Sequence, residues 1–300
     1  MKLSHLTATL LLSSVAFLSA EEKTAAPPTK SDIPEGLVPL APKQTTHFAF
    51  LCLKDKEMAK DADIKAALMR WFQLKDESEI VRYKQDPQKG TLSFTIGKAR
   101  FVAALAEYSI PAPDLQYASN NSLHWPDAEK ELLQQQAHYT VTCTSIYPKK
   151  WMTSLALSKA ISALAETHHP LGIYWGDASI VHSPETFIKL SKQELRADNK
   201  NIPADLWVGI LLEKHKDGTV SAYTDGLRVL GFREMEIQNS QLDRTKAYSI
   251  LSALSLQVVR NNQTIQENEE VATPEDGSYP TKLGDSNIGR KQKVIVISAQ

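Results

Sequence analysis

The residues that could carry out chemistry gather after a short apolar segment, Gly172-Ile173-Tyr174-Trp175-Gly176. Asp177 follows this segment directly, and His182 comes five residues later. A carboxylate that orients an imidazole is typical of general base catalysis, and the same two groups can also bind a metal. The alternative is structural: Asp177 caps a turn, and His182 is a surface residue before a Ser-Pro pair.

A second candidate pair is Glu234 and Glu236, which are separated by one residue, Met235. Side chains two positions apart on a strand share a face, so these carboxylates could bind a cation or divide acid and base roles. The same alternation also fits a charged outer face, with Met235 and Ile237 turned toward the core. Both interpretations remain open at the level of sequence.

Three aromatic residues, Tyr117, Trp125 and Trp175, lie in or beside predicted loops. Aromatic side chains are enriched at recognition surfaces, so the three residues predict a binding surface. Trp175 could instead belong to the core, and Trp125 could pack beneath its own loop. We interpret the pair His168-His169 as structural, because imidazolium is favourable at the carboxyl end of a helix.

Common catalytic motifs are absent from the chain. It contains no Gly-x-Ser-x-Gly, His-Glu-x-x-His, P-loop or Gly-x-Gly-x-x-Gly pattern. The formal net charge of -1 provides no long-range attraction to nucleic acid. We therefore predict no cofactor, no bound metal and no nucleic-acid partner.

The two cysteines, Cys52 and Cys143, have no metal-ligand spacing and lie in apolar segments. In an oxidising compartment they could form one disulfide, and otherwise they would be two small buried side chains.

The amino terminus has the pattern of a signal peptide. Lys2 precedes an apolar run over residues 6–18, and Ala20 precedes two glutamates, so we predict a signal peptide over residues 1–20. The alternative is an apolar helix that stays attached. Residues 21–46 contain five prolines and are predicted to be a linker. We expect an exported protein, periplasmic or secreted, with no transmembrane segment after cleavage.

The elements that must position these residues alternate along the chain. Two segments, residues 47–52 and 138–143, share a His-to-Cys spacing and are each followed by a helix and a strand, which suggests an internal duplication. A helix is predicted over 153–166, with Ser154, Ser158 and Ser162 facing outward. The continuous apolar run 206–212 predicts a central strand. We predict an α+β fold with two related ferredoxin-like halves, residues 47–136 and 137–300, mostly antiparallel sheets and helices packed on one face.

Several short motifs follow one another in an order that resembles a known family. They are Pro111-Ala112-Pro113, Trp125-Pro126, Ala137-His138, the Gly172 to Gly176 segment, Thr224-Asp225-Gly226-Leu227 and Gly231-Phe232-Arg233-Glu234-Met235-Glu236. Over roughly residues 46–264 the chain resembles the bacterial domain-of-unknown-function family 4261. One departure is Asn261-Asn262-Gln263-Thr264, where the family would have an Asp-Gly-Asp-Thr-like turn. The resemblance implies an architecture but no activity.

Two functions follow from these patterns. The first is a non-catalytic binding or accessory protein of the cell envelope, with an envelope or secreted protein as partner. The alternative is a hydrolase or metal-dependent enzyme that uses Asp177, His182, Glu234 and Glu236. The absence of any motif with a known mechanism favours the first.

Overall fold

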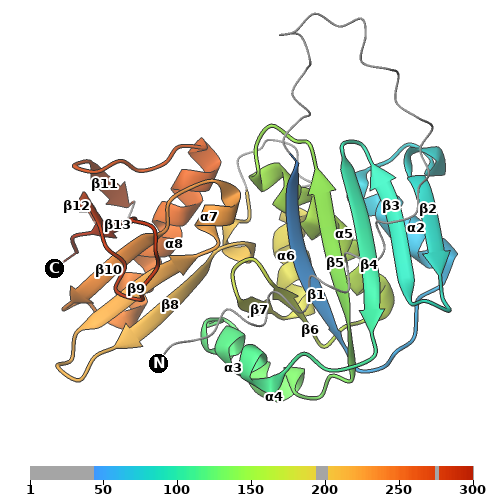
Figure 1. Ribbon diagram of the computed structural model, residues 1–300, viewed down its shortest axis with the longest axis horizontal. Coiled ribbons are helices and arrows are strands. Elements are labelled where there is room, and N and C mark those ends of the chain that lie inside the picture. Colours follow the sequence, from blue (N-terminus) through green and yellow to red (C-terminus); the bar gives the residue numbers. More distant parts are fainter. Residues whose placement is uncertain (1–43, 194–201, 274–276, 300) are drawn as a thin grey trace, which may run out of the picture. The chain divides into compact units, whose positions relative to one another are not determined.

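The computed structural model describes residues 44–193, 202–273 and 277–299. These residues form an α+β fold, as the sequence predicts (Figure 1). The predicted signal peptide lies outside the described residues, as does the linker up to residue 43. The last two linker residues, Thr45 and Thr46, belong instead to the first strand. Among the described helices, none combines the length and the apolar character needed to span a bilayer.

The first sheet has seven strands in the spatial order β2-β3-β4-β5-β1-β6-β7, and every neighbouring pair is antiparallel. Its strands are β1 (Thr45–Leu53), β2 (Val81–Asp86), β3 (Thr91–Ile96), β4 (Ala99–Ala106), β5 (Ala137–Ser145), β6 (Gly172–Trp175) and β7 (Ile180–His182). Strand β1 lies between β5 and β6, so it joins strands that are far apart in sequence.

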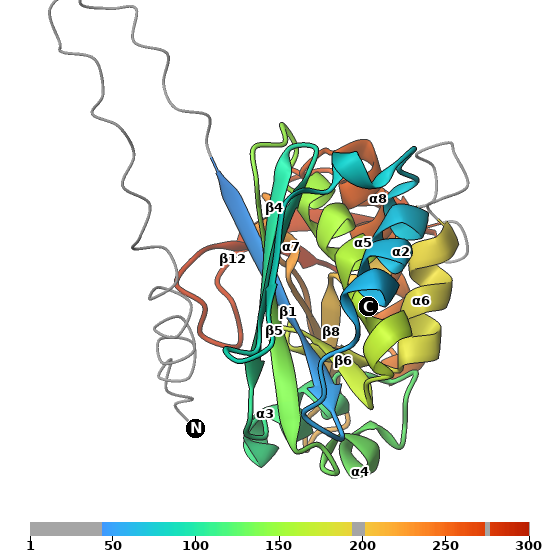
Figure 2. The ribbon, with the colours of Figure 1, turned by 90° about the vertical axis from the view of Figure 1, so that its right-hand side faces the viewer.

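Helices cover one face of this sheet: α2 (Asp61–Phe72), α5 (Trp151–His168) and α6 (Pro184–Gln193) (Figure 2). The short helices α3 (Ala112–Asn120) and α4 (Ala128–Leu132) lie in the connection from β4 to β5, and η2 (Glu77–Glu79) precedes β2. Helix α2 buries Ile64, Leu68 and Trp71, the stripe that a period of 3.6 residues predicts.

Helix α5 is buried on more sides than its sequence suggests. Ser154, Ser158 and Ser162 are predicted to face outward, but all three are fully buried. Ser154 Oγ lies 3.0 Å from His47 Nδ1, and Ser158 Oγ accepts a hydrogen bond of 2.8 Å from Trp207 Nε1. The prediction is wrong because α5 packs against the sheet on one side and against the segment around Trp207 on another.

The second sheet has six strands in the order β11-β12-β13-β10-β9-β8. They are β8 (Gly209–Lys214), β9 (Val220–Asp225), β10 (Met235–Ser240), β11 (Glu270–Thr273), β12 (Gly277–Gly284) and β13 (Val294–Ile297). The pair β10–β13 is parallel, and the other pairs are antiparallel. Helix α8 (Arg244–Asn261) packs on this sheet and begins at Asp243, whose side chain accepts a hydrogen bond from Lys246 N.

One feature of the second sheet differs from the prediction. Residues 206–212 do not form a central strand: η3 (Ala204–Leu206) is a single helical turn, and β8 is an edge strand. A buried run of apolar residues does not distinguish these cases, because Leu206 and Trp207 are buried without belonging to a strand. A short helix, α7 (Leu227–Leu230), separates β9 from β10.

The two predicted ferredoxin-like halves are not confirmed. Strands from both sides of the predicted boundary at residues 136 and 137 form one sheet, with β5 inserted between β1 and β4. The two matched segments are neighbours within it: His47 lies opposite Cys143, and Cys52 lies opposite His138. The repeated spacing therefore belongs to two paired strands.

This register also decides the state of the cysteines, which are both free and buried. Residues that lie opposite each other share a face, and His47 and Cys52 are five positions apart on one strand. Cys52 and Cys143 consequently point to opposite faces of the sheet and cannot form a disulfide. Burial raises the pKa of the Cys52 thiol to about 12 and raises that of Cys143 as well.

The contact between Ser158 and Trp207 generates a test of how α5 is held. Ser158→Ala should lower the free energy of unfolding by roughly 1–3 kcal/mol, because the buried Trp207 N–H loses its acceptor. The matched control is Ser162→Ala on the same helix, whose hydroxyl has no hydrogen-bond partner among the described residues. In urea denaturation Ser162→Ala should be neutral or stabilising, because it removes a buried hydroxyl that makes no hydrogen bond. Equal losses in the two variants would contradict the assignment.

Candidate functional site

Asp177 lies in the turn between β6 and β7, and the structure gives it a partner that the sequence did not suggest. Its Oδ2 lies 3.0 Å from Nδ1 of His47, and Ser154 Oγ lies 3.0 Å from the same nitrogen. These are the residue types of a serine hydrolase triad, in which the serine and the aspartate bind different ring nitrogens. Here both meet Nδ1, and the side chains of His47 and Asp177 are only 1% and 6% exposed. The cluster holds β1, α5 and the β6–β7 turn together.

His182 lies apart from this cluster, beside a small cavity of about 40 Å³ that His124, Trp125 and Tyr248 also line. Its Nε2 is 3.3 Å from the Leu206 carbonyl oxygen, so Nε2 carries the proton and donates. Burial lowers the pKa of His182 to about 4, although the hydrogen bond to Leu206 acts in the opposite direction. A cavity of this size suits a few water molecules at most. His182 is therefore a neutral structural residue at neutral pH.

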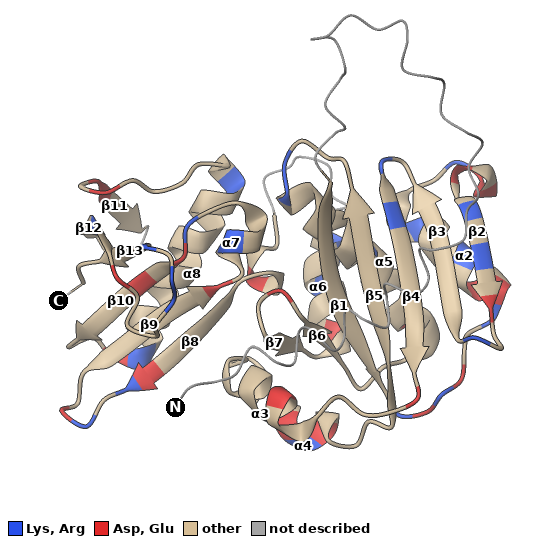
Figure 3. Ribbon diagram, viewed as in Figure 1, with Lys and Arg blue, Asp and Glu red and all other residues tan. Residues whose placement is uncertain are grey.

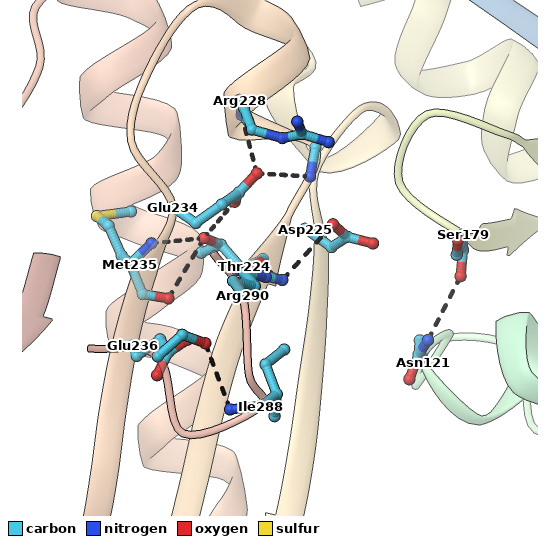
Figure 4. Close-up of polar contacts among 12 residues, drawn as sticks. Asn121, Ser179, Thr224, Asp225, Arg228, Glu234, Met235, Glu236, Ile288 and Arg290 are labelled. Atoms are coloured by element: carbon cyan, nitrogen blue, oxygen red, sulfur yellow. Dashed lines mark hydrogen bonds and ion pairs between the residues drawn. The ribbon is translucent and has the colours of Figure 1, made fainter. Parts of the chain in front are cut away.

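Glu234 is 5% exposed, so the interpretation of an exposed charged face is wrong for it. Its carboxylate accepts hydrogen bonds from Thr224 Oγ1 at 2.7 Å, from Gly226 N at 3.2 Å and from Arg228 N at 2.8 Å (Figure 4). Burial raises the pKa of Glu234; the Arg228 N–H, the Arg290 charge and the Thr224 hydroxyl lower it, and the Asp225 charge raises it. Glu234 thus fixes the turn that follows β9.

Glu236 is completely buried and serves a different segment. It accepts hydrogen bonds from Gln238 Nε2 at 2.8 Å, from Asn287 N at 3.0 Å and from the Ser286 hydroxyl. These contacts anchor the loop between β12 and β13, residues 285–293. The two glutamates therefore bind separate sets of donors. Within the described ranges, no group of three His, Cys, Asp or Glu side chains is placed to hold a metal ion.

Of the three aromatic residues predicted to bind, one is accessible. Trp175 is fully buried, so its assignment to a binding surface is wrong. Trp125 is half-buried and packs against Gly172. A Cβ atom added to Gly172 would lie 2.8 Å from the Trp125 ring atom Cη2. Tyr117 on α3 is 39% exposed.

Tyr117 belongs to a group of polar residues that come from separate segments, which we call the Asp225 junction. It comprises Tyr117, Asn121, Tyr174, Ser179, Asp225 and Arg290. Arg290 donates to the Thr224 carbonyl oxygen at 2.6 Å and lies 3.5 Å from Asp225 Oδ1. Asn121 Nδ2 donates to the Ser179 carbonyl oxygen at 3.4 Å. In Figure 4 the Asp225 carboxylate points away from Glu234, toward the side on which Asn121 and Ser179 lie.

The charges of the junction act on one another. Burial raises the pKa of Asp225; Arg290 and Arg228 lower it, and Asp177 raises it. Burial and then the Asp225 charge raise the pKa of Tyr117, while Asn121 and Arg290 lower it. Burial raises the pKa of Tyr174 to about 12, with a contribution from Asp225. Contacts join the four segments. Asn121 at the end of α3 binds Ser179 of the β6–β7 turn, a Cβ added at Gly226 after β9 would lie 2.9 Å from the Cβ of Ala178 in that turn, and Arg290 of the β12–β13 loop binds Thr224 of β9.

Sequence reasoning anticipated only part of this junction. It singled out Tyr117, and Asp225 stood in one of the quoted motifs. Arg290 lies in a polar stretch between two strands, where the sequence carries no signal of a partner. Only the folding of the β12–β13 loop over the second sheet brings it to Asp225.

Comparisons with known proteins found no matching family model, no matching curated protein and no matching solved structure. The resemblance to family 4261 therefore stays a prediction.

The half-buried imidazole of His182 predicts a pH dependence of stability. Its pKa is about 4 in the folded chain and near 6.5 when unfolded, so the unfolded state binds the proton more readily. The contribution of the neutral imidazole to the free energy of unfolding is complete above pH 6.5 and is lost as the pH falls toward 4. His182→Gln keeps an N–H donor but does not titrate. Between pH 7 and pH 4 its free energy of unfolding should therefore fall by roughly 2–3 kcal/mol less than that of the wild-type chain.

The measurement is the free energy of unfolding of both proteins between pH 4 and 7.5. His138 and His168, whose pKa values burial also lowers, are present in both and cancel in the difference. Parallel curves would contradict the assignment.

Glu236 predicts a second effect on stability. Glu236→Ala should cost roughly 2–4 kcal/mol, because three donors lose the buried carboxylate that accepts their hydrogen bonds. Glu213→Ala is the control, since this carboxylate is 56% exposed. Limited proteolysis should then cut within residues 285–293 of the Glu236 variant first. If the cleavage pattern is unchanged, Glu236 does not anchor the loop.

Proposed function

We propose that this protein is an exported, non-catalytic binding or accessory protein of the cell envelope, which recognises a protein partner through the Asp225 junction. The observation that carries the proposal is the partly exposed Asp225–Arg290 pair, with Ile288 exposed on the loop that carries Arg290. Tyr117 is exposed on α3, and the Asp225 charge contributes to its raised pKa. Tyrosine and arginine are the residue types that most often dominate interface energetics. Four chain segments contribute to the junction: α3, the β6–β7 hairpin, the end of β9 and the β12–β13 loop.

The engagement of the candidate catalytic groups supports binding over hydrolysis. Asp177 is paired with His47, His182 donates to Leu206, and both glutamates bind neighbouring backbone or side-chain donors. A catalytic group needs free access to the reacting atoms within hydrogen-bond reach. The fold uses each of these residues to hold its own segments.

Export rests on the pattern of residues 1–20, and an architecture of family 4261 rests on the ordered motifs. The net charge of -1 favours a protein partner over nucleic acid.

The test is affinity capture of the mature chain from its own envelope fraction, followed by mass spectrometry. A stoichiometric partner should be recovered with the wild-type chain. The double variant Tyr117→Ala/Ile288→Ala should reduce its recovery at least about tenfold, as expected for loss of a central aromatic contact.

The matched control is Tyr108→Ala/Ile146→Ala, which removes the same residue types from exposed positions, 57% and 42% exposed, outside the junction. Equal loss of the partner in both double variants would reject the junction as the binding surface. Failure of the wild-type chain to retain any partner in repeated captures would reject the binding function.

A further inference from the structure

Strands β2 to β5 of the first sheet have one face that no helix covers in the described part of the chain. Helices α2, α5 and α6 all lie on the other side, as Figure 2 shows. Along β3 and β5, and along β4 as far as Ala104, buried residues alternate with half-buried or exposed ones. Since successive side chains of a strand point to opposite faces, the more exposed set lines the uncovered side. We call this side of β2 to β5 the open face.

Two cations lie on the open face. Arg100 of β4 is opposite Thr95 and Thr144, and Lys84 of β2 is opposite Ser93, so both share the face of these hydroxyl residues. Both basic side chains are exposed, and neither forms an ion pair with another described residue. The spacing of strands and of residues along a strand puts their Cα atoms about 12 Å apart.

The surface between these cations carries no opposing charge. Strands β3, β4 and β5 contain no Asp or Glu, and Figure 3, which looks onto the open face, shows basic positions on β2 and β4 and no charged position on β3 or β5. Asp86 ends β2 at the margin of this face, and its Oδ1 accepts a hydrogen bond from Lys89 N at 3.2 Å. An anionic ligand would therefore gain from both cations without meeting a carboxylate between them.

The neighbours of the cations are short hydroxyl side chains. Ser93, Thr95 and Thr140 are half-buried, and their hydroxyls form no hydrogen bond with the described residues. Each hydroxyl can donate one hydrogen bond and accept two. Serine and threonine are under-represented among the residues that dominate protein–protein interfaces. The open face therefore suits a ligand rich in hydroxyl groups better than it suits a second protein.

We infer that the open face binds an acidic polysaccharide, with Arg100 and Lys84 binding carboxylates of its uronic acid sugars and the hydroxyls of β3 and β5 binding sugar hydroxyls. A guanidinium can hold a carboxylate through two parallel hydrogen bonds. A polymer that carries a carboxylate on every sugar offers an acid group to each of the two cations. This surface is separate from the Asp225 junction, so the inference goes beyond the proposed recognition of a protein.

The first experiment titrates the isotope-labelled mature chain with an oligogalacturonate and follows the chemical shifts. The matched compound is its methyl ester, which keeps the sugars and removes the charge. Shifts should change at Arg100, Lys84 and Thr95, and the ester should bind at least about tenfold more weakly, as expected when hydrogen bonds to charged groups are lost. Equal binding of the two compounds, or shifts confined to residues outside the open face, would overturn the inference.

An oligoglutamate with the same number of carboxylates separates a polysaccharide from an acidic protein segment. It should bind at least about tenfold more weakly than the oligogalacturonate, because it lacks the sugar hydroxyls. Equal or tighter binding of the peptide would reject a polysaccharide as the ligand.

The variant Arg100→Gln should weaken oligogalacturonate binding at least about tenfold. Its matched control is Arg260→Gln, which removes an exposed guanidinium from α8 on the second sheet. If the two variants lose the same affinity, the attraction is a general one to positive charge and the inference fails.

The double variant Thr95→Val/Thr140→Val tests the hydroxyls, since valine keeps the shape of threonine and suits a strand. Its affinity for the oligogalacturonate should fall at least about threefold. Unchanged affinity would mean that these hydroxyls do not bind the sugar, which contradicts the inference. These measurements require no protein partner, so their failure leaves the proposed binding function standing.

Discussion

Much of the structure depends on helix α5 being buried on several sides. A helix of this kind has to place its hydroxyl groups against partners, since a buried polar group without one is costly. Ser154 meets His47 of β1, and Ser158 meets Trp207 beyond the first sheet. Each contact joins α5 to a different part of the chain. The helix thus connects the sheet that contains β1 with the segment that leads into β8.

The same requirement explains why so many polar side chains bind neighbouring segments of the chain. Asp177 of the β6–β7 turn lies 3.0 Å from His47, Glu234 binds backbone donors of the turn after β9, and Glu236 binds the β12–β13 loop. All three residues lie against connections between strands. A hydrogen bond to an ionised carboxylate is roughly twice as strong as one between neutral groups, so Glu234 and Glu236 can hold the segments that donate to them. The loops that form the Asp225 junction are positioned in this way.

The junction differs from these contacts in that its groups are partly exposed and incompletely paired. Asp225 and Arg290 approach each other at 3.5 Å, and Tyr117 remains accessible on α3. Four chain segments contribute to it, and the contacts among them bring its groups together within the folded chain. Partly exposed groups that the fold already holds in place are the physical basis of the proposed recognition.

The sequence by itself determined the local elements. Apolar residues marked the segments 47–52 and 138–143, which lie within β1 and β5, and a period of 3.6 residues placed the helix at 153–166, which lies within α5. The α+β class followed from these elements. Hydrophobic periodicity succeeds here because it depends on neighbours within a few residues.

Only the tertiary structure decided which faces are buried and which distant residues meet. Ser158 and Glu236 are polar residues in the core because packing reaches them from a second side, which local pattern cannot report. The antiparallel pairing of β1 with β5 separated the cysteines onto opposite faces. Arg290 reached Asp225 across 65 positions of sequence through the β12–β13 loop. Such contacts depend on chain topology, and patterns within a single sequence do not show which distant segments become neighbours.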